Sequence, residues 1–169
     1  AEATFVARTH DMDRKHMQET FRRAHEHRGS SLVEIFQNCN VFNDGAFAQI
    51  TKKDKRDSML IQLTHGEPIR FGEENEFGVI SNSQGNAEIV KVADVGESAL
   101  IVHDETCEDP SLAFSLSRLA SGPYEPTPVG VFREVQRPEY ASVANQQIDV
   151  ARSQQGPGDI SDLLNSQPT

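Results

Sequence analysis

Two cysteines are the residues of this 169-residue chain most able to carry chemistry. Cys39 lies in a polar loop, between Asn38 and Asn40, directly after a predicted strand. A thiolate at this position could act as a nucleophile, which needs a nearby base, or as a ligand of a metal or cluster. The sequence contains no Cys-x-x-Cys pair, so companion ligands would come from elsewhere. A packed, unreactive thiol is the third interpretation, and position alone leaves all three open.

The other candidate groups give weaker signals. Cys107 lies in an acidic segment, residues 104–109, whose carboxylates disfavour a thiolate, so we expect it to be structural or simply exposed. Four of the six histidines gather near the N-terminus: His10, His16, His25 and His27. They lack a metal-ligand spacing such as His-Glu-x-x-His, and we expect them on a solvated helix surface. The sequence also lacks a glycine-rich phosphate loop, a Gly-x-Ser-x-Gly motif and an EF-hand.

Composition narrows the class of protein. The net charge of −10 argues against nucleic acid or an anionic membrane as the main partner. No apolar run approaches the ~20 residues of a membrane span. Two cysteines exclude a disulfide scaffold and favour a reducing, cytoplasmic setting. Residues 1–70 hold 11 basic and 10 acidic side chains, whereas residues 71–169 hold 5 and 16. The acidic part is either a solvated face or a surface for basic groups of a partner.

The elements that position Cys39 form a predicted βαβ unit. Its parts are a strand at residues 4–8, a helix capped by Asp11 or Asp13 that ends near Gly29, and a buried strand at residues 31–37. Strands joined by such a helix are parallel, with a right-handed crossover. The Cys39 loop therefore lies at the carboxyl end of a strand, where open parallel sheets bind their ligands.

The rest of the chain predicts shorter elements. Helices are expected at residues 52–63, 109–119 and 138–152. Short strands are expected at residues 68–71, 77–81, 87–92, 99–103 and 129–135. From residue 154 the chain is rich in Gly, Ser, Gln and Pro, and we expect a loosely held, flexible tail in which Ile160, Leu163 and Leu164 dock as a single turn. The residues alone thus predict an α/β chain with an unusual Asn-Cys-Asn loop.

This loop carries a more specific resemblance. Residues 29–45, which include Gln-Asn-Cys-Asn-Val-Phe-Asn-Asp, resemble the end of the thiamine-diphosphate-binding domain in the β subunit of 2-oxoacid:ferredoxin oxidoreductases, nearest to the 2-oxoglutarate branch. Weaker matches extend the resemblance over most of the chain, at residues 53–56, 65–72, 103–105 and 128–133. The resemblance implies that residues 1–50 are the last βαβ part of that parallel-sheet domain. Residues 51–153 would then form a mixed α+β C-terminal region, and residues 154–169 the tail.

The resemblance also implies a function. The enzyme would decarboxylate a 2-oxo acid, here 2-oxoglutarate, oxidatively to acyl-coenzyme A and pass the electrons through a [4Fe-4S] cluster to ferredoxin. Cys39 would be one cluster ligand, and Asn38, Asn40 and Asn43 would be its cofactor-binding neighbours. The three other cluster cysteines, and the Gly-Asp-Gly motif for Mg²⁺ and thiamine diphosphate, are expected before residue 1. The chain would then be the C-terminal part of the subunit, inactive alone and partnered by the rest of the β subunit and by an α subunit.

Two alternatives belong to other classes. The chain could be a non-catalytic α/β interaction module in which Cys39 is simply packed. It could also be a hydrolase that uses Cys39 as its nucleophile, although the sequence indicates no catalytic triad around this residue.

Overall fold

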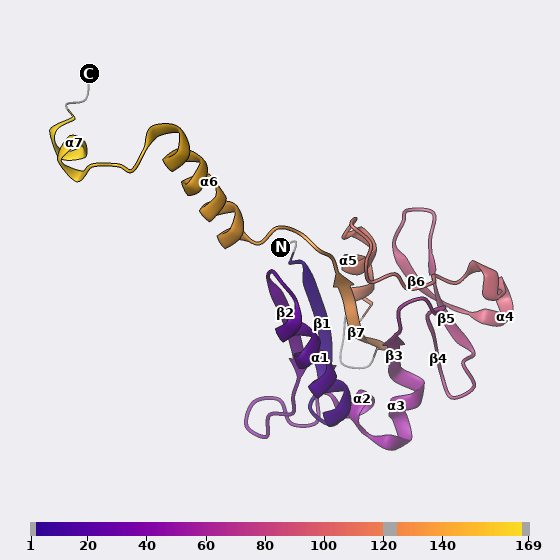
Figure 1. Ribbon diagram of the computed structural model, residues 1–169. Coiled ribbons are helices and arrows are strands. Elements are labelled where there is room, and N and C mark those ends of the chain that lie inside the picture. The colour runs from indigo at the N-terminus through magenta and orange to yellow at the C-terminus, as the bar shows by residue number, and fades with distance from the viewer. Residues whose placement is uncertain (1–2, 120–124, 167–169) are drawn as a thin grey trace. The chain divides into compact units, whose positions relative to one another are not determined.

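The computed structural model describes residues 3–119 and 125–166 (Figure 1). The chain divides into two compact units, residues 1–136 and 137–169. The first unit holds every described strand and is a mixed α/β structure, as the sequence predicts. Its assignment to a thiamine-diphosphate-binding domain stays a prediction.

The main sheet of the first unit confirms the predicted βαβ unit. Strand β1 (Phe5–His10) leads into helix α1 (Arg14–Glu26) and then strand β2 (Ser31–Phe36), and β1 and β2 are parallel. Asp13 caps α1, because its carboxylate accepts a hydrogen bond from the His16 N–H at 3.0 Å. The full strand order is β2-β1-β7-β3, with β7 (Thr127–Glu134) antiparallel to β1 and parallel to β3 (Leu60–Leu63).

The predicted helix at residues 52–63 is wrong in its second half. Two short helices, α2 (Ala48–Thr51) and α3 (Lys53–Met59), are followed by strand β3. Ile61 and Leu63 of β3 are buried, and Gln62 between them is exposed, so these residues alternate with the period of a strand. The pairing of β3 with β7 therefore outweighs the local helical preference.

Close pairing of β3 and β7 depends on Gly130. This residue has a φ of +117°, and a Cβ placed on it would lie 2.8 Å from the carbonyl oxygen of Leu63. A side chain here would be strained in its backbone and would clash with the neighbouring strand.

A second sheet follows, with strand order β4-β5-β6. It is an antiparallel meander of β4 (Arg70–Phe71), β5 (Phe77–Ser81) and β6 (Ala87–Lys91). Helix α4 (Val92–Val95) and the 3₁₀ turn η1 (Glu97–Ala99) come next. The predicted strand at residues 99–103 is replaced by this turn and by one isolated bridge between Pro68 and Val102.

Helix α5 (Ser111–Ser117) follows Pro110, close to the predicted position. It contributes Leu116 to the larger core cluster of the first unit, which joins both sheets. The buried members of that cluster are Ile61, Leu63, Ile69, Phe71, Val79, Leu116 and Phe132. A smaller cluster lies beneath α1 and is built on Phe5, Ala7 and Val131.

The second unit contains helices α6 (Tyr140–Gln155) and α7 (Ile160–Asn165). The first matches the predicted helix, and the second is the short turn anticipated in the tail. In residues 3–119 and 125–166, no helix combines the length and apolar character that crossing a membrane requires.

Strand β2 differs from its prediction in burial. The sequence predicts a buried strand, yet β2 lies at the edge of the sheet and its Leu32 and Ile35 are 57% and 42% exposed. Its apolar side chains have neighbours on only part of their surface, because no described strand pairs with its outer edge.

Candidate functional site

The loop at residues 38–45 begins two residues after β2, at the carboxyl ends of the parallel strands β1 and β2. Its ends are brought together by an antiparallel bridge in which the Asn43 N–H donates to the Cys39 carbonyl at 2.8 Å. At its far end the ring of Phe47 stacks on that of Phe36, with centroids 4.6 Å apart. The loop is thus anchored to the strand that precedes it, where the sequence predicts chemistry.

Asn38 organises this loop. Its amide Nδ2 donates to Oδ1 of Asn40 at 2.8 Å and to Oδ1 of Asp44 at 3.1 Å. Its Oδ1 accepts from the Gly45 N–H at 2.8 Å, and its backbone N–H donates to the Asp11 carboxylate at 3.2 Å. The side chains of Asn38 and Asn40 are therefore engaged with each other inside the loop. Their predicted role beside a cofactor stays a prediction.

Backbone amides of the loop act on the thiol of Cys39. The N–H group of Phe42, followed by those of Val41 and Asn43, hydrogen-bonds to the thiol and lowers its pKa. Burial raises the pKa by more than the Asn43 N–H lowers it, and the Asp44 carboxylate also raises it, but the net direction is down. The lowered pKa favours the thiolate, which is the form that binds metal. Donors of this kind also tune the potential of iron–sulfur clusters, so the residues present fit a cluster ligand.

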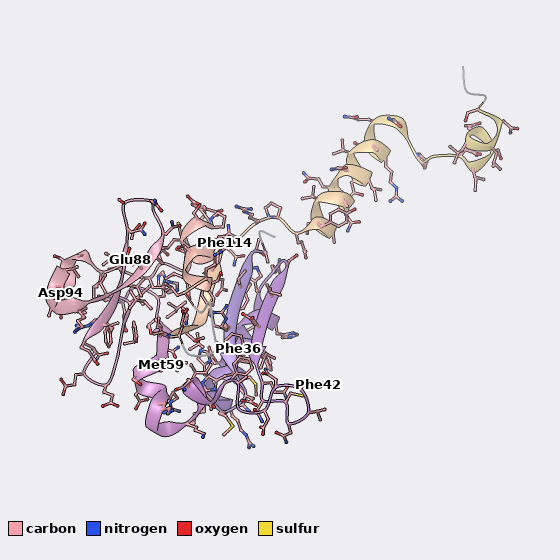
Figure 2. All side chains as sticks on the ribbon, turned by 180° about the vertical axis from the view of Figure 1, so that it is seen from behind. Phe36, Phe42, Met59, Glu88, Asp94 and Phe114 are labelled. Carbon is pink, nitrogen blue, oxygen red and sulfur yellow. The ribbon has the colours of Figure 1, made fainter. Side chains whose placement is uncertain are left out.

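The tip of the loop is apolar and open to solvent in this chain. Val41 is exposed, and Phe42 is 92% exposed and lies at the outer edge of the loop (Figure 2). The sulfur of Cys39 is therefore approached from the outside of the chain, where further ligands from another segment have access.

The described part of the chain supplies one candidate metal ligand, not a set. No group of three or more His, Cys, Asp or Glu residues that could hold a metal lies within it. Cys107 is a free, partly buried thiol, and its expected role as a structural or simply exposed residue stays a prediction. A cluster at Cys39 would need its other ligands from outside this chain, as the resemblance implies.

The histidine prediction is partly wrong. His25 is exposed, but His10 is buried at the end of β1, and the ring of His27 is buried against Thr4, with Nε2 2.8 Å from Thr4 Oγ1. Burial lowers the pKa of His10. His10 ends β1, shortly before α1 begins, and His27 is the residue that directly follows α1. Sequence periodicity alone does not reveal that these positions are buried.

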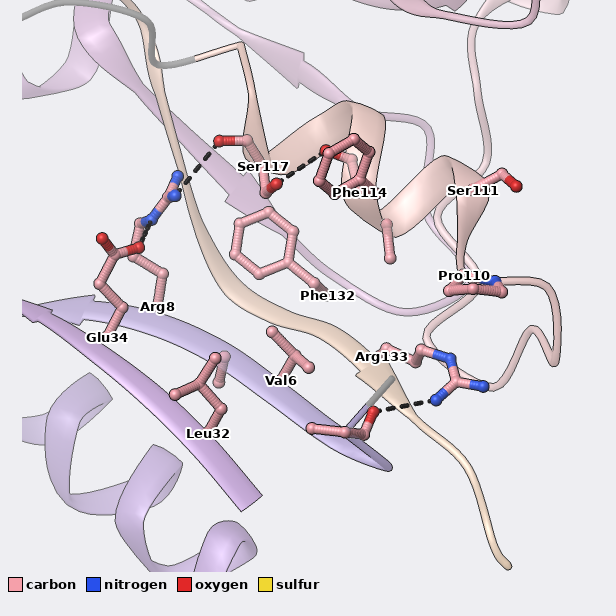
Figure 3. A pocket seen from close by; sticks show the side chains of 13 residues that line it. Val6, Arg8, Leu32, Glu34, Pro110, Ser111, Phe114, Ser117, Phe132 and Arg133 are labelled. Carbon is pink, nitrogen blue, oxygen red and sulfur yellow. Dashed lines mark hydrogen bonds and ion pairs between the residues drawn. The ribbon is translucent and has the colours of Figure 1, made fainter. Parts of the chain in front are cut away.

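A pocket of about 490 Å³ lies on the face of the sheet opposite α1, between the β1–β2 pair and α5 (Figure 3). Its walls are mainly apolar, from Val6, Leu32, Phe114 and Phe132. Sequence reasoning missed this pocket because its residues come from four separate segments, within residues 3–8, 32–34, 110–117 and 132–133.

At one end of the pocket the buried Arg8 donates to the Glu34 carboxylate at 2.6 Å and to the carbonyls of Pro128 and Ser117 at 3.3 and 3.2 Å. Its guanidinium also lies over the rings of Phe36 and Phe132, 5.1 and 5.2 Å from their centroids. One side chain thus ties β1 to β2, β7 and α5.

Comparison with known proteins identifies a relative. No family model matches the chain. The chain is 44% identical over 153 residues to 2-oxoglutarate oxidoreductase subunit KorB of Mycobacterium tuberculosis (strain ATCC 25618 / H37Rv). The predicted resemblance to the β subunits of 2-oxoacid:ferredoxin oxidoreductases is confirmed. The match covers 90% of this chain and 40% of KorB, so the chain spans about two fifths of the length of this relative.

Proposed function

We propose that this chain is part of the β subunit of a 2-oxoacid:ferredoxin oxidoreductase that acts on 2-oxoglutarate. The 44% identity with KorB over nine tenths of the chain carries this proposal. The complete enzyme would convert the 2-oxo acid and coenzyme A to acyl-coenzyme A and CO₂, with ferredoxin as the electron acceptor. Thiamine diphosphate with Mg²⁺ would supply the decarboxylation chemistry, and a [4Fe-4S] cluster would supply a path for single electrons.

In this enzyme Cys39 would be a cluster ligand. The N–H groups of Val41, Phe42 and Asn43 would stabilise the thiolate before and after the ligand bond forms, because they already favour its negative charge. Asn38 would hold the loop in the shape that aims these amides at the sulfur. The thiamine-diphosphate site and the other cluster ligands would lie in the rest of the β subunit, with the α subunit as a further partner.

The setting of the chain fits this role. Both of its cysteines are free thiols, as expected in the reducing cytoplasm. The thiol of Cys39 has a lowered pKa and lies in an exposed loop. Both properties suit a segment that contributes one ligand to a site completed by another part of the subunit.

The test uses the native assembly, prepared without oxygen. Iron content and visible absorbance are compared between the wild type, Cys39→Ser and Cys107→Ser. We expect Cys39→Ser to lose most of the cluster absorbance and the matched Cys107→Ser control to keep it, because the resemblance to the family lies in the Cys39 loop. A full and stable cluster in Cys39→Ser would refute the ligand role and would favour a packed thiol in a non-catalytic module.

A further inference from the structure

Four basic side chains lie at the end of the main sheet that carries the Cys39 loop. They are Arg14 and Lys15 in the first turn of α1, and Lys52 and Lys55 at the start of α3. Helix α1 begins shortly after β1 ends. Strand β3 begins at the same end of the sheet, because β7 runs antiparallel to β1 and parallel to β3. The helix that leads directly into β3, α3, therefore lies at this end too (Figure 1).

These four side chains, which we call the basic edge, are exposed. None of them has a carboxylate partner among the side chains that the structure describes. Asp13 and Asp44 lie at the same end, but they accept hydrogen bonds from the first turn of α1 and from Asn38. By contrast, Arg8 and Arg23 are paired with carboxylates of other elements. The charge of the basic edge is therefore available to a molecule outside the chain.

The positions of these cations work against the helices that carry them. The N-terminal end of a helix favours acidic side chains, yet Arg14 and Lys15 occupy the first turn of α1, which contains no acidic residue. Lys52 is the N-cap of α3 and makes no capping bond, at a position where Ser, Thr, Asp or Asn would stabilise the helix. Residues that break a local rule without a gain inside the fold are typical of functional positions.

The later part of the chain has the opposite charge. Residues 71–169 hold 5 basic and 16 acidic side chains, against 11 and 10 in residues 1–70. An acidic partner is therefore repelled by residues 71–169 and attracted by the basic edge. Lysine is depleted in the buried centres of interfaces, whereas exposed charges that speed association are typical of short-lived encounters. The basic edge thus fits a transient acidic partner better than a permanent subunit contact.

We propose that the basic edge docks the acidic iron–sulfur protein that accepts electrons from the enzyme. This inference rests on the proposed function, in which Cys39 holds the cluster that the electrons leave. Electron transfer requires the donor and the acceptor to approach closely, so the docking surface has to lie beside the Cys39 loop. The basic edge and this loop lie at the same end of the main sheet.

Binding of a purified ferredoxin, acidic and with one [4Fe-4S] cluster, to the native assembly tests this proposal. Calorimetric titration at low salt compares the wild type with two pairs of changes: Lys52→Glu with Lys55→Glu, and Arg28→Glu with Lys91→Glu. Both pairs replace two exposed cations by two anions, but Arg28 lies beyond the other end of α1 and Lys91 ends β6. We expect the first pair to weaken binding roughly tenfold or more and the control pair less than about twofold. The difference should narrow at about 1 M salt, which screens charges beyond roughly 3 Å.

A third pair separates docking from damage to the fold. Arg14→Glu with Lys15→Glu places acidic side chains where the dipole of α1 favours them, so the melting temperature should rise while ferredoxin binding weakens. Unchanged binding in either basic-edge pair, or equal weakening in the control pair, would overturn the proposal. A raised KM for coenzyme A or loss of the α subunit, with ferredoxin binding unchanged, would also overturn it. Binding can be measured in Cys39→Ser as well, so the inference and the proposed function fail separately.

Discussion

Replacement of Arg8 by methionine is the sharpest test of how the fold supports the Cys39 loop. Arg8 is buried, with its side chain 9% exposed, and makes hydrogen bonds to Glu34 and to two backbone carbonyls. Methionine is also long and unbranched, so it fills the apolar pocket wall without the guanidinium. The change therefore removes hydrogen bonds and keeps most of the packing.

The expected loss of stability is about 3.5–7 kcal/mol, the sum of the contributions that follow. The pair with Glu34 contributes at most about 1 kcal/mol, because that carboxylate is 50% exposed. Each bond to a carbonyl contributes roughly 1 kcal/mol at these lengths, and the buried carbonyl of Pro128 loses a partner at a further cost of about 1–3 kcal/mol. The loss of the cation–π contacts with Phe36 and Phe132 adds about 0.5–1 kcal/mol.

Urea denaturation followed by far-ultraviolet circular dichroism measures this loss, with Glu34→Gln as the matched control. Glu34→Gln keeps an acceptor for Arg8 and removes only the charge, so it should cost less than about 1 kcal/mol. Arg8→Lys should fall between the two, because an ammonium lacks the planar fork of donors. If Arg8→Met proves no more destabilising than Glu34→Gln, Arg8 does not hold the four elements together in the way described.

Two further predictions concern titration. Phe42→Pro removes the N–H that contributes most to the lowered pKa of Cys39. In a Cys107→Ser background, the pH dependence of Cys39 alkylation should therefore shift to higher pH. Phe42→Ala keeps this N–H and should leave the pH dependence unchanged. Burial lowers the pKa of His10 and of His103, whose Nε2 lies 2.7 Å from the Val131 carbonyl. The unfolded chain then binds more protons, so urea midpoints should fall as the pH falls from about 7.5 through 6.5, and a flat profile above about pH 5.5 would contradict this linkage.

The sequence predicted the local parts of the fold where short-range signals agree. Asp13 and the apolar spacing after it predict α1, and the runs on either side predict two parallel strands. The errors occur where distant pairing decides. Residues 60–63 form a strand because β7, nearly seventy residues later, pairs with them. The same holds for β7 itself, whose antiparallel pairing with β1 cannot be anticipated from local periodicity.

The candidate site was predictable in its position but not in its chemistry. The order of strand, helix, strand and polar loop is enough to place Cys39 at the carboxyl end of a parallel pair. The asparagines around it suggested side-chain donors to a cofactor, whereas the groups that lower the pKa of the thiol are backbone amides, including that of Phe42. The directions in which these N–H groups point depend on the conformation of the loop. Asn38 fixes that conformation through its contacts with Asn40 and Gly45, which cannot be predicted from the residue types alone.

Hydrogen bonds with β1 and with the residue after it hold both β2 and the start of the Cys39 loop. Arg8 joins β1 to Glu34 of β2, and Asp11 joins the end of β1 to the Asn38 N–H at the start of the loop. Both links cross from β1 to β2 or to the loop that follows it, so any fraying of β2 from its uncovered edge would disturb the turn that aims the amides at Cys39. Arg8→Met removes the first of these links, so it should move the alkylation profile of Cys39 in the same direction as Phe42→Pro.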